Sequence, residues 1–225
     1  MKVKRFRAFH DNYIWGIQSD NFLTIVDPGE SKPVIDYLNK NAKTNLACIL
    51  VTHHHADHVG GIQNLISYSN SISDDKKYFS INDTVTDKIP IIGPYGFDKY
   101  GVNFPVRGGD SFNIGKNKFV VLDIPGHTSS HIGYICKDIT DKNLSLFCGD
   151  TMFAAGCGRI LGGTAEDLFD SILKIADLPD STLIYCAHEY SLNNIQFAAK
   201  QFPDDINIKK RKKDIETLTK EKKAT

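Results

Sequence analysis

The sequence has no apolar run that approaches the roughly 20 residues needed to cross a bilayer, and its basic start, residues 1–5, leads into no long apolar stretch. We therefore expect neither a membrane span nor a secretory signal. The sequence also lacks an excess charge of either sign, because 27 Lys and Arg side chains balance 27 Asp and Glu side chains. This balance argues against a dedicated nucleic-acid binder, which usually carries a basic excess.

A disulfide framework is also missing from the pattern. There is no C-x-x-C pair, and the five cysteines are an odd number, so they cannot all pair with one another. Four of them lie in or beside apolar runs, where a free thiol behaves as a small hydrophobic residue. Cys157 lies in a glycine-rich loop without a histidine and asparagine arrangement that would make it a nucleophile. These features predict a reducing, cytoplasmic compartment.

The chain of 225 residues is 41% apolar and 24% charged, which is typical of a globular domain. Short apolar runs between turn residues predict strands, and the segment 165–176 predicts a helix that Thr164 caps with Asp167 three residues on. Strands mixed with helices in both halves predict a layered α/β fold with a short helical tail. Strands are predicted at 3–9, 13–18, 22–26, 46–51, 112–114, 118–124, 132–136, 144–148 and 183–186, with fragments at 77–81 and 89–92 in a weakly patterned region (69–109), and further helices at 31–41, 62–67, 192–201 and from 208 onward.

Four predicted strands end in the same way, with a histidine or an aspartate soon after the apolar run. In open α/β sheets the carboxyl ends of strands are where ligands collect. If these strands are neighbours, their ends form a single cluster. The strands lead into the run His53-His54-His55-Ala56-Asp57-His58, into His127, into Asp150 and into His188.

These residue types suit a divalent transition metal, since imidazole binds zinc, iron and related ions, and a carboxylate can bridge two of them. In the first run, a strand-like step predicts that His53, His55 and Asp57 point to one side and His58 to another, which fits a loop that serves two metals. The candidates exceed one tetrahedral site and suffice for two sites that share a carboxylate. The seven candidate ligands are His53, His55, Asp57, His58, His127, Asp150 and His188.

The H-x-H-x-D-H run resembles the signature of the metallo-β-lactamase superfamily, and the match extends over residues 11 to 190 in the order of the glyoxalase II family, the hydroxyacylglutathione hydrolases. The family-level resemblance rests mainly on Gly-Cys-Gly-Arg at 156–159 and Ala-His-Glu-Tyr at 187–190. The other matching segments are Asp11-Asn12-Tyr13-Ile14-Trp15, Val26-Asp27-Pro28-Gly29, residues 52–61, Pro125-Gly126-His127-Thr128 and Phe147-Cys148-Gly149-Asp150-Thr151.

The resemblance implies an αββα sandwich, with a catalytic domain over residues 1–190 and a short helical region over 191–225. It also implies two divalent ions, zinc in the first place and iron or manganese as alternatives. In that arrangement His53, His55 and His127 hold one metal, Asp57, His58 and His188 hold the other, and Asp150 bridges both together with a water or hydroxide.

The reaction implied by the resemblance is hydrolysis of S-D-lactoylglutathione, or another glutathione thioester, to glutathione and D-lactate or a related hydroxy acid. A hydroxide held by the two metals attacks the carbonyl, and the metals stabilise the oxyanion. Asp57 and Asp150 are the catalytic residues on this hypothesis, acting through the metals. The expected partner is this small molecule, without nucleic acid or membrane, and the expected state is a monomer.

Two positions match substrate contacts of the family, Arg159 for the glutathione carboxylate and Tyr190 for a tyrosine contact. Other positions depart from the family. Leu161 stands where an aromatic residue is common, and only 35 residues follow Tyr190, without the usual terminal basic motif. Either a short variant of the family's helical region or a truncated chain accounts for this departure, and both put part of the glutathione grip in question.

Three alternatives to this function remain open at the level of sequence. A glutathione persulfide dioxygenase of the same superfamily binds a single iron with fewer ligands, and a lactonase or β-lactamase shares the fold. A metal-binding module without catalysis is the third. The basic run at 209–213 is flanked by acidic residues and is interpreted as a solvated helix.

Overall fold

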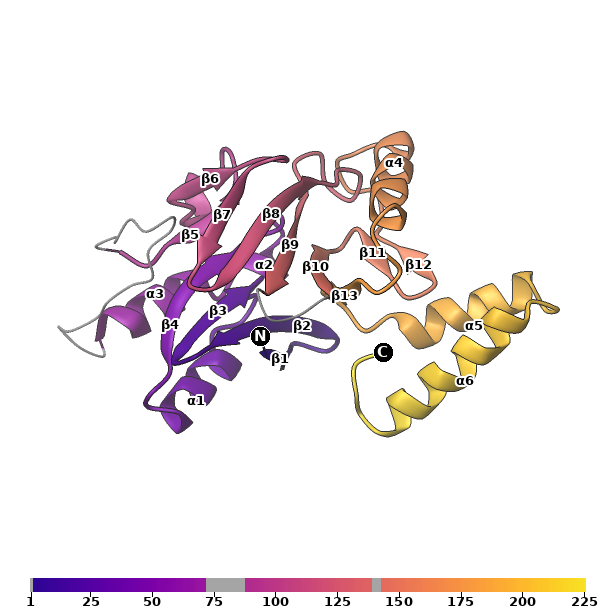
Figure 1. Ribbon diagram of the computed structural model, residues 1–225, viewed down its shortest axis with the longest axis horizontal. Helices are drawn as coiled ribbons and strands as arrows, with labels where there is room; N and C mark the ends of the chain where they lie inside the picture. Colours follow the sequence, from indigo (N-terminus) through magenta and orange to yellow (C-terminus); the bar gives the residue numbers. More distant parts are fainter. Residues whose placement is uncertain (1, 72–87, 139–142) are drawn as a thin grey trace.

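The computed structural model describes residues 2–71, 88–138 and 143–225, and its first large sheet combines an antiparallel meander with a parallel half (Figure 1). The strand order is β1-β2-β3-β4-β5-β6, antiparallel from β1 to β3 and parallel from β3 to β6. The strands are β1 (Lys2–Ala8), β2 (Asn12–Ser19), β3 (Phe22–Val26), β4 (Asn45–Leu50), β5 (Ile91–Pro94) and β6 (Phe104–Val106).

The second large sheet has the order β13-β10-β9-β8-β7. Since β10 is parallel to β13 and antiparallel to β9, which is antiparallel to β8, the strands β8, β10 and β13 all run in one direction. Their carboxyl ends therefore meet at one edge. The strands are β7 (Ser111–Ile114), β8 (Asn117–Asp123), β9 (Ile132–Asp138), β10 (Leu144–Gly149) and β13 (Leu183–Cys186), with a separate ribbon of β11 (Met152–Phe153) and β12 (Gly156–Cys157).

Helices cover the outer face of each sheet, which completes the predicted αββα sandwich (Figure 1). Val34 and Leu65 belong to a buried cluster with the outer face of the first sheet, and Ile175 packs on the second sheet. Thr164 and Asp167 form the predicted capping box. The helices are α1 (Lys32–Lys40), α2 (Ala56–Val59), α3 (Ile62–Ser71), the 3₁₀ turn η1 (Asp98–Tyr100), α4 (Ala165–Ala176), α5 (Ser191–Gln201) and α6 (Ile206–Lys220).

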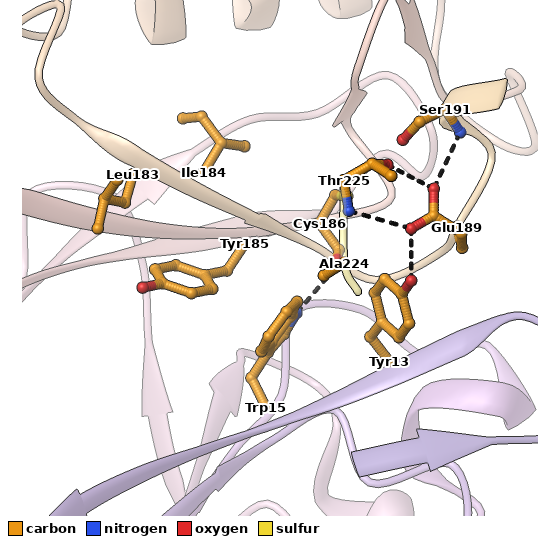
Figure 2. A pocket seen from close by; sticks show the side chains of 10 residues that line it. All are labelled: Tyr13, Trp15, Leu183, Ile184, Tyr185, Cys186, Glu189, Ser191, Ala224 and Thr225. Carbon is orange, nitrogen blue, oxygen red and sulfur yellow. Dashed lines mark hydrogen bonds between the residues drawn. The ribbon is translucent and has the colours of Figure 1, made fainter. Parts of the chain in front are cut away.

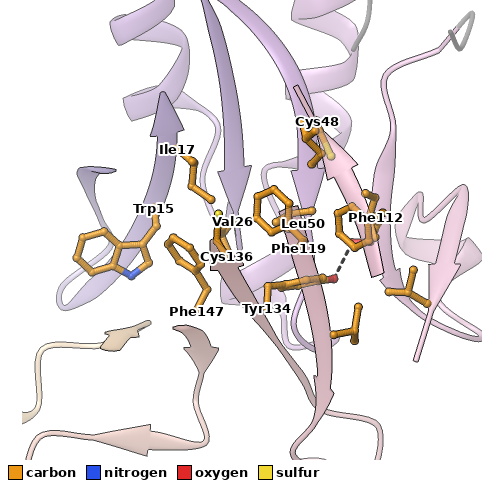
Figure 3. Packing of buried hydrophobic residues seen from close by; sticks show 14 of the residues in the cluster. Trp15, Ile17, Val26, Cys48, Leu50, Phe112, Phe119, Tyr134, Cys136 and Phe147 are labelled. Atoms are coloured by element: carbon orange, nitrogen blue, oxygen red, sulfur yellow. Dashed lines mark hydrogen bonds between the residues drawn. The ribbon is translucent and has the colours of Figure 1, made fainter. Parts of the chain in front are cut away.

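The main core lies between the two sheets, where alternate residues of facing strands interdigitate (Figure 3). Phe112 and Phe119 stack with ring centroids 5.3 Å apart. The fully buried Tyr134 on β9 satisfies its hydroxyl across the core, by donating to the carbonyl of Val51 at 2.8 Å and lying 3.1 Å from that of Ile92. This hydrogen bond ties the second sheet to Val51, the residue directly after β4.

A second connection joins the first sheet to the segment after β13 (Figure 2). The carboxylate of Glu189 accepts hydrogen bonds from the Tyr13 hydroxyl at 2.5 Å, from the Thr225 hydroxyl at 2.6 Å and from the Ser191 amide at 3.3 Å. Burial raises the pKa of Glu189, but these donors outweigh burial and hold the pKa below its usual value. The adjacent pocket, about 220 Å³ in volume, is lined by Trp15 and Tyr185 among others.

The helices α5 and α6 follow as an antiparallel pair (Figure 1). The side-chain amide of Asn194 on α5 donates to the Ala154 carbonyl at 3.3 Å, which ties this pair to the segment between β11 and β12. Across the described residues, none of the helices combines the length and hydrophobicity of a membrane span. The division at residue 190 into catalytic domain and tail stays a prediction.

Most predicted elements are confirmed, and the differences have local causes. The helix predicted at 62–67 continues to Ser71, and the last helix begins at Ile206, where Asp205 caps two backbone amides. The strand β6 was missed because its three residues contain Pro105, which disfavours strand assignment. The strand predicted at 77–81 lies outside the described residues.

Replacing Tyr134 with phenylalanine is expected to lower the free energy of unfolding by about 1–2 kcal/mol, because a buried hydrogen bond between the sheets is lost. Urea unfolding measures this change. Tyr68→Phe is the matched control, because its exposed hydroxyl donates only to Asn39. Equal stability of the two variants would contradict the role of Tyr134.

Tyr13→Phe is expected to lower the free energy of unfolding by about 1–2 kcal/mol at neutral pH, since a carboxylate loses a buried donor. A carboxyl with a depressed folded pKa stabilises above its unfolded value, here 4.5, and loses that contribution as the pH falls through the folded pKa. The difference between wild type and variant should therefore shrink below pH 4.5 in urea titrations. A deficit that persists unchanged at pH 3 would count against this hydrogen bond.

Candidate metal centre

The seven candidate ligands, predicted from four strand ends, meet at one edge of the sandwich, between the two sheets. One set comes from the segment between β4 and α2 and from the loop after β8, and the other comes from α2 and the loop after β13. We name them the first ligand group (His53, His55 and His127) and the second ligand group (Asp57, His58 and His188). Asp150, directly after β10, lies between them.

In the first ligand group, three imidazole nitrogens point at a common centre. His55 Nδ1 lies 3.1 Å from His53 Nε2 and 3.0 Å from His127 Nε2. Two ligand atoms at about 2.0–2.1 Å from a tetrahedral ion are about 3.4 Å apart, so the spacing is close to that of a zinc-type site.

In the second ligand group, one carboxylate and two imidazoles converge in the same way. Asp57 Oδ2 lies 3.5 Å from His58 Nε2 and 3.4 Å from His188 Nε2. These distances also match the separation of ligands around a tetrahedral ion. Each of the two ligand groups thus has the spacing of side chains that surround one ion.

The carboxylate of Asp150 divides its two oxygens between the groups. Oδ2 lies 3.4 Å from His127 Nε2, whereas Oδ1 lies 3.5 Å from His58 Nε2 and 3.3 Å from His188 Nε2. Among the described residues, Asp150 Oδ1 and His58 Nε2 are buried without a hydrogen-bond partner. Buried polar atoms are rarely left so, and a bound cation would satisfy both. The buried His and Asp clusters are consistent with a dinuclear metal site.

In four of the histidines, Nδ1 is the outer nitrogen, which faces away from the centre, and it lies close to a polar group of the protein. His53 Nδ1 lies 3.0 Å from the Thr52 hydroxyl, and His127 Nδ1 lies 2.7 Å from the Arg159 carbonyl. His58 Nδ1 lies 3.1 Å from Asp27 Oδ2, and His188 Nδ1 lies 2.9 Å from Asp11 Oδ1. Each contact lies on the Nδ1 side of a ring whose Nε2 faces the centre, so it orients that ring.

The supporting roles of Asp27, Asp11 and Asn12 were missed from the sequence. Asp27 follows the apolar run of β3, so it shares the strand-end signal, but it is not among the seven candidate ligands predicted from the sequence. Asp11 lies in the turn before β2 and Asn12 is the first residue of that strand; both belong to a segment that matches the family, but no local pattern marks them as supports of the centre. Asn12 Nδ2 donates to Asp57 Oδ2 at 2.9 Å, which fixes that ligand's orientation.

Asp27 groups with His53 and His58 as a third possible ligand set, but its oxygens are already engaged. The Thr52 amide donates to Oδ1 at 2.8 Å and the Thr52 hydroxyl to Oδ2 at 2.7 Å. Asp27 also faces the Nδ1 of His58, on the side away from Asp150. It therefore supports ligands and is not one of them. Its φ of 51° is unusual for a residue other than glycine and fits a strained supporting position.

The strand-like step predicted for residues 53–58 is wrong in its geometry. Ala56–Val59 forms the helical turn α2, so Asp57 and His58 diverge from His53 and His55 by helical rotation. His54 turns away and packs its ring on Tyr100, with centroids 6.2 Å apart.

Glycine is needed where the loop after β12 passes the centre. A Cβ on Gly158 would lie 1.9 Å from the Asp150 carbonyl oxygen and 3.2 Å from His127 Nδ1. Only a residue without a side chain allows this approach. The same loop carries Arg159, whose carbonyl holds His127.

Nearby carboxylates favour the protonated form of the two histidines in the second ligand group. Burial lowers the pKa of His58, but Asp150 and Asp27 outweigh burial and raise it to about 10. Burial likewise lowers the pKa of His188, and Asp150 and Asp57 raise it to about 10. Burial and the neighbouring histidines instead lower the pKa of His53. The second ligand group therefore favours positive charge more strongly than the first.

The predicted substrate contacts border the centre. Tyr190 stacks on His188 with centroids 4.8 Å apart, and its ring is 36% exposed. Burial and nearby aspartates raise the pKa of Tyr190 to about 12, so its hydroxyl keeps its proton and can donate. The Arg159 side chain is exposed to solvent. Leu161 beside it is 56% exposed and offers no ring.

Comparison of the chain with known proteins shows which family it belongs to. A model of the metallo-beta-lactamase superfamily matches residues 9–188. A hydroxyacylglutathione hydrolase of Vibrio parahaemolyticus is 40% identical over 219 residues, which cover 97% of this chain and 77% of that protein. A hydroxyacylglutathione hydrolase of Nitrosomonas eutropha is 41% identical over 217 residues, which cover 96% and 75%.

Solved structures agree on the fold. The crystal structure of ETHE1 from Myxococcus xanthus is similar with a TM-score of 0.66 and 27% identity, covering 84% of this chain and 76% of that one. The BLEG-1 B3 metallo-beta-lactamase has a TM-score of 0.67 and 21% identity, covering 83% and 91%. With residues 9–188 matched and relatives near 40% identity, the chain belongs to the metallo-beta-lactamase superfamily and, within it, to the hydroxyacylglutathione hydrolase family.

Proposed function

We propose that the chain hydrolyses a glutathione thioester, with S-D-lactoylglutathione as the leading substrate, at a centre of two divalent ions. The observation that carries the proposal is the position of Asp150, whose two oxygens lie 3.3–3.5 Å from imidazoles of both ligand groups. The substrate class is supported by relatives at about 40% identity that are hydroxyacylglutathione hydrolases.

The residues assigned to the ions fit them in number, type and spacing. The first ligand group would hold one ion, the second would hold the other, and Asp150 would contact both. Two such ions, when bound, supply Lewis acidity that activates water and polarises a carbonyl. Imidazole and carboxylate ligands accept zinc, iron and manganese alike.

The chain's own side chains then orient the thioester. The Tyr190 hydroxyl, held neutral beside His188, can donate a hydrogen bond to the bound substrate. Arg159 brings a positive charge for a glutathione carboxylate, while its backbone carbonyl stays on His127. Since a thiolate is a good leaving group, the site needs no strong acid to protonate it.

Steady-state hydrolysis of S-D-lactoylglutathione, with metal analysis on the same sample, tests the function. We expect saturable turnover and about two metals per chain. A chain with two metals that leaves this thioester and other glutathione thioesters intact would overturn the substrate class. Oxygen consumption with glutathione persulfide at one iron per chain would favour a dioxygenase instead.

Asp150→Asn is expected to lower kcat/KM by at least about 100-fold and to reduce bound metal below two per chain, because losing a shared ligand costs more than losing an outer support. Activity and inductively coupled plasma mass spectrometry on one sample measure both effects. Asp170→Asn, a change on the exposed face of α4, is the control. Unaltered metal content together with full turnover in Asp150→Asn would refute the bridging role.

Arg159→Ala is expected to raise KM for the thioester about tenfold, the size of one lost ionic hydrogen bond, while kcat changes less than about twofold. Metal content should stay constant, because His127 is held by the backbone carbonyl of Arg159. Arg159→Lys should recover part of the KM. If KM does not respond to either change, Arg159 is not a substrate contact.

A further inference from the structure

The two ligand groups differ in the charge that stands around them. The first ligand group consists of three neutral-type imidazoles, whereas the second contains the carboxylate of Asp57. Asp150 is common to both, so it does not distinguish them. A divalent cation at the second group therefore faces one more negative ligand than a cation at the first.

The polar groups that contact the outer nitrogens of the histidines add to this difference in negative charge. In the first ligand group, the outer nitrogens of His53 and His127 meet a hydroxyl and a backbone carbonyl, both neutral. In the second, both histidines meet carboxylates, Asp27 at 3.1 Å and Asp11 at 2.9 Å. A carboxylate behind a ligating imidazole raises its basicity and fixes its tautomer.

Burial strengthens these charges unequally. The side chains of His58 and Asp27 are 1% and 4% exposed, so their interaction is screened little by water. Asp11 is 32% exposed, which makes it the support that can be altered with least damage to the fold. Its other oxygen lies 3.7 Å from His10, whose side chain is fully in solvent.

Backbone contacts also hold the loop that carries His188 in the second ligand group. Asn12 pairs with His188 in an isolated β-bridge, the Tyr13 amide donates to the Ala187 carbonyl at 2.7 Å, and the Glu189 amide donates to the Asp11 carbonyl at 3.0 Å. The turn between β1 and β2 is thereby fixed to the loop after β13. Ligands held in place before the metal arrives bind with a smaller entropic cost.

We propose that the second ligand group binds its divalent ion more tightly than the first, and that Asp11 is a positioning residue that sets this difference through His188. The inference rests on the proposed dinuclear centre. It concerns the order in which the two positions fill and the residue that fixes this order. At limiting metal, the chain should hold one ion at the second group and leave the first free.

The test is a zinc titration of the metal-free chain against a chromogenic chelator, which yields two dissociation constants. Wild type should show a tight and a weak step. Asp11→Asn should weaken the tight step about 10–100-fold and leave the weak one within about twofold. Asp11→Glu, which keeps the charge, should weaken the tight step less. Asp20→Asn, an exposed aspartate far from the centre, is the matched control.

Ligand variants identify which step belongs to which group. His55→Ala should abolish the weak step and keep the tight constant, and His188→Ala should abolish the tight one. The inference is overturned if Asp11→Asn titrates like wild type, if it changes only the weak step, or if His55→Ala removes the tight step. A wild-type chain that saturates with one ion overturns the dinuclear centre as well. Two unequal steps without thioester turnover would instead reject only the proposed substrate.

Discussion

The carboxylate of Asp150, buried between imidazoles from both sheets, is the constraint on which the rest of the site depends. A buried carboxylate is costly unless positive charge surrounds it. Here one oxygen faces His127 and the other faces His58 and His188, all within 3.3–3.5 Å. His131 holds the backbone of Asp150, because its Nε2 accepts a hydrogen bond from the Asp150 amide at 3.2 Å. The loops that follow the strands of both sheets therefore meet around the carboxylate of Asp150.

The fold explains how ligands so far apart in the chain come together. In the second sheet β8, β10 and β13 run in one direction and deliver His127, Asp150 and His188 to one edge. The first sheet delivers its histidines from β4, and the Tyr134 hydrogen bond joins the two sheets directly before them, at Val51. The core of Figure 3 thus sets the distance between two sets of ligands that neither sheet could hold alone.

The sequence was informative where a local pattern met a strand end, and uninformative where contacts depend on tertiary structure. The seven candidate ligands could be proposed because they follow apolar runs, and periodicity located most strands. Asp11 could not be assigned a role, because its contact with His188 joins residues 177 positions apart and nothing local marks it. The strand-like geometry for residues 53–58 failed because Ala56 begins a helical turn directly after His55. Asp27 also follows an apolar run, but its contacts with Thr52 and His58 join residues that are distant in the sequence.

The central claim is that one carboxylate joins two metal positions, and magnetic coupling tests it most directly. Two manganese ions that share a bridging group about 3.5–4 Å apart exchange-couple, as in other two-metal sites of that spacing. Electron paramagnetic resonance of the chain loaded with two Mn²⁺ ions should therefore show the spectrum of a coupled pair. Two independent Mn²⁺ signals at full loading would show that Asp150 does not join the two positions, and would contradict the account.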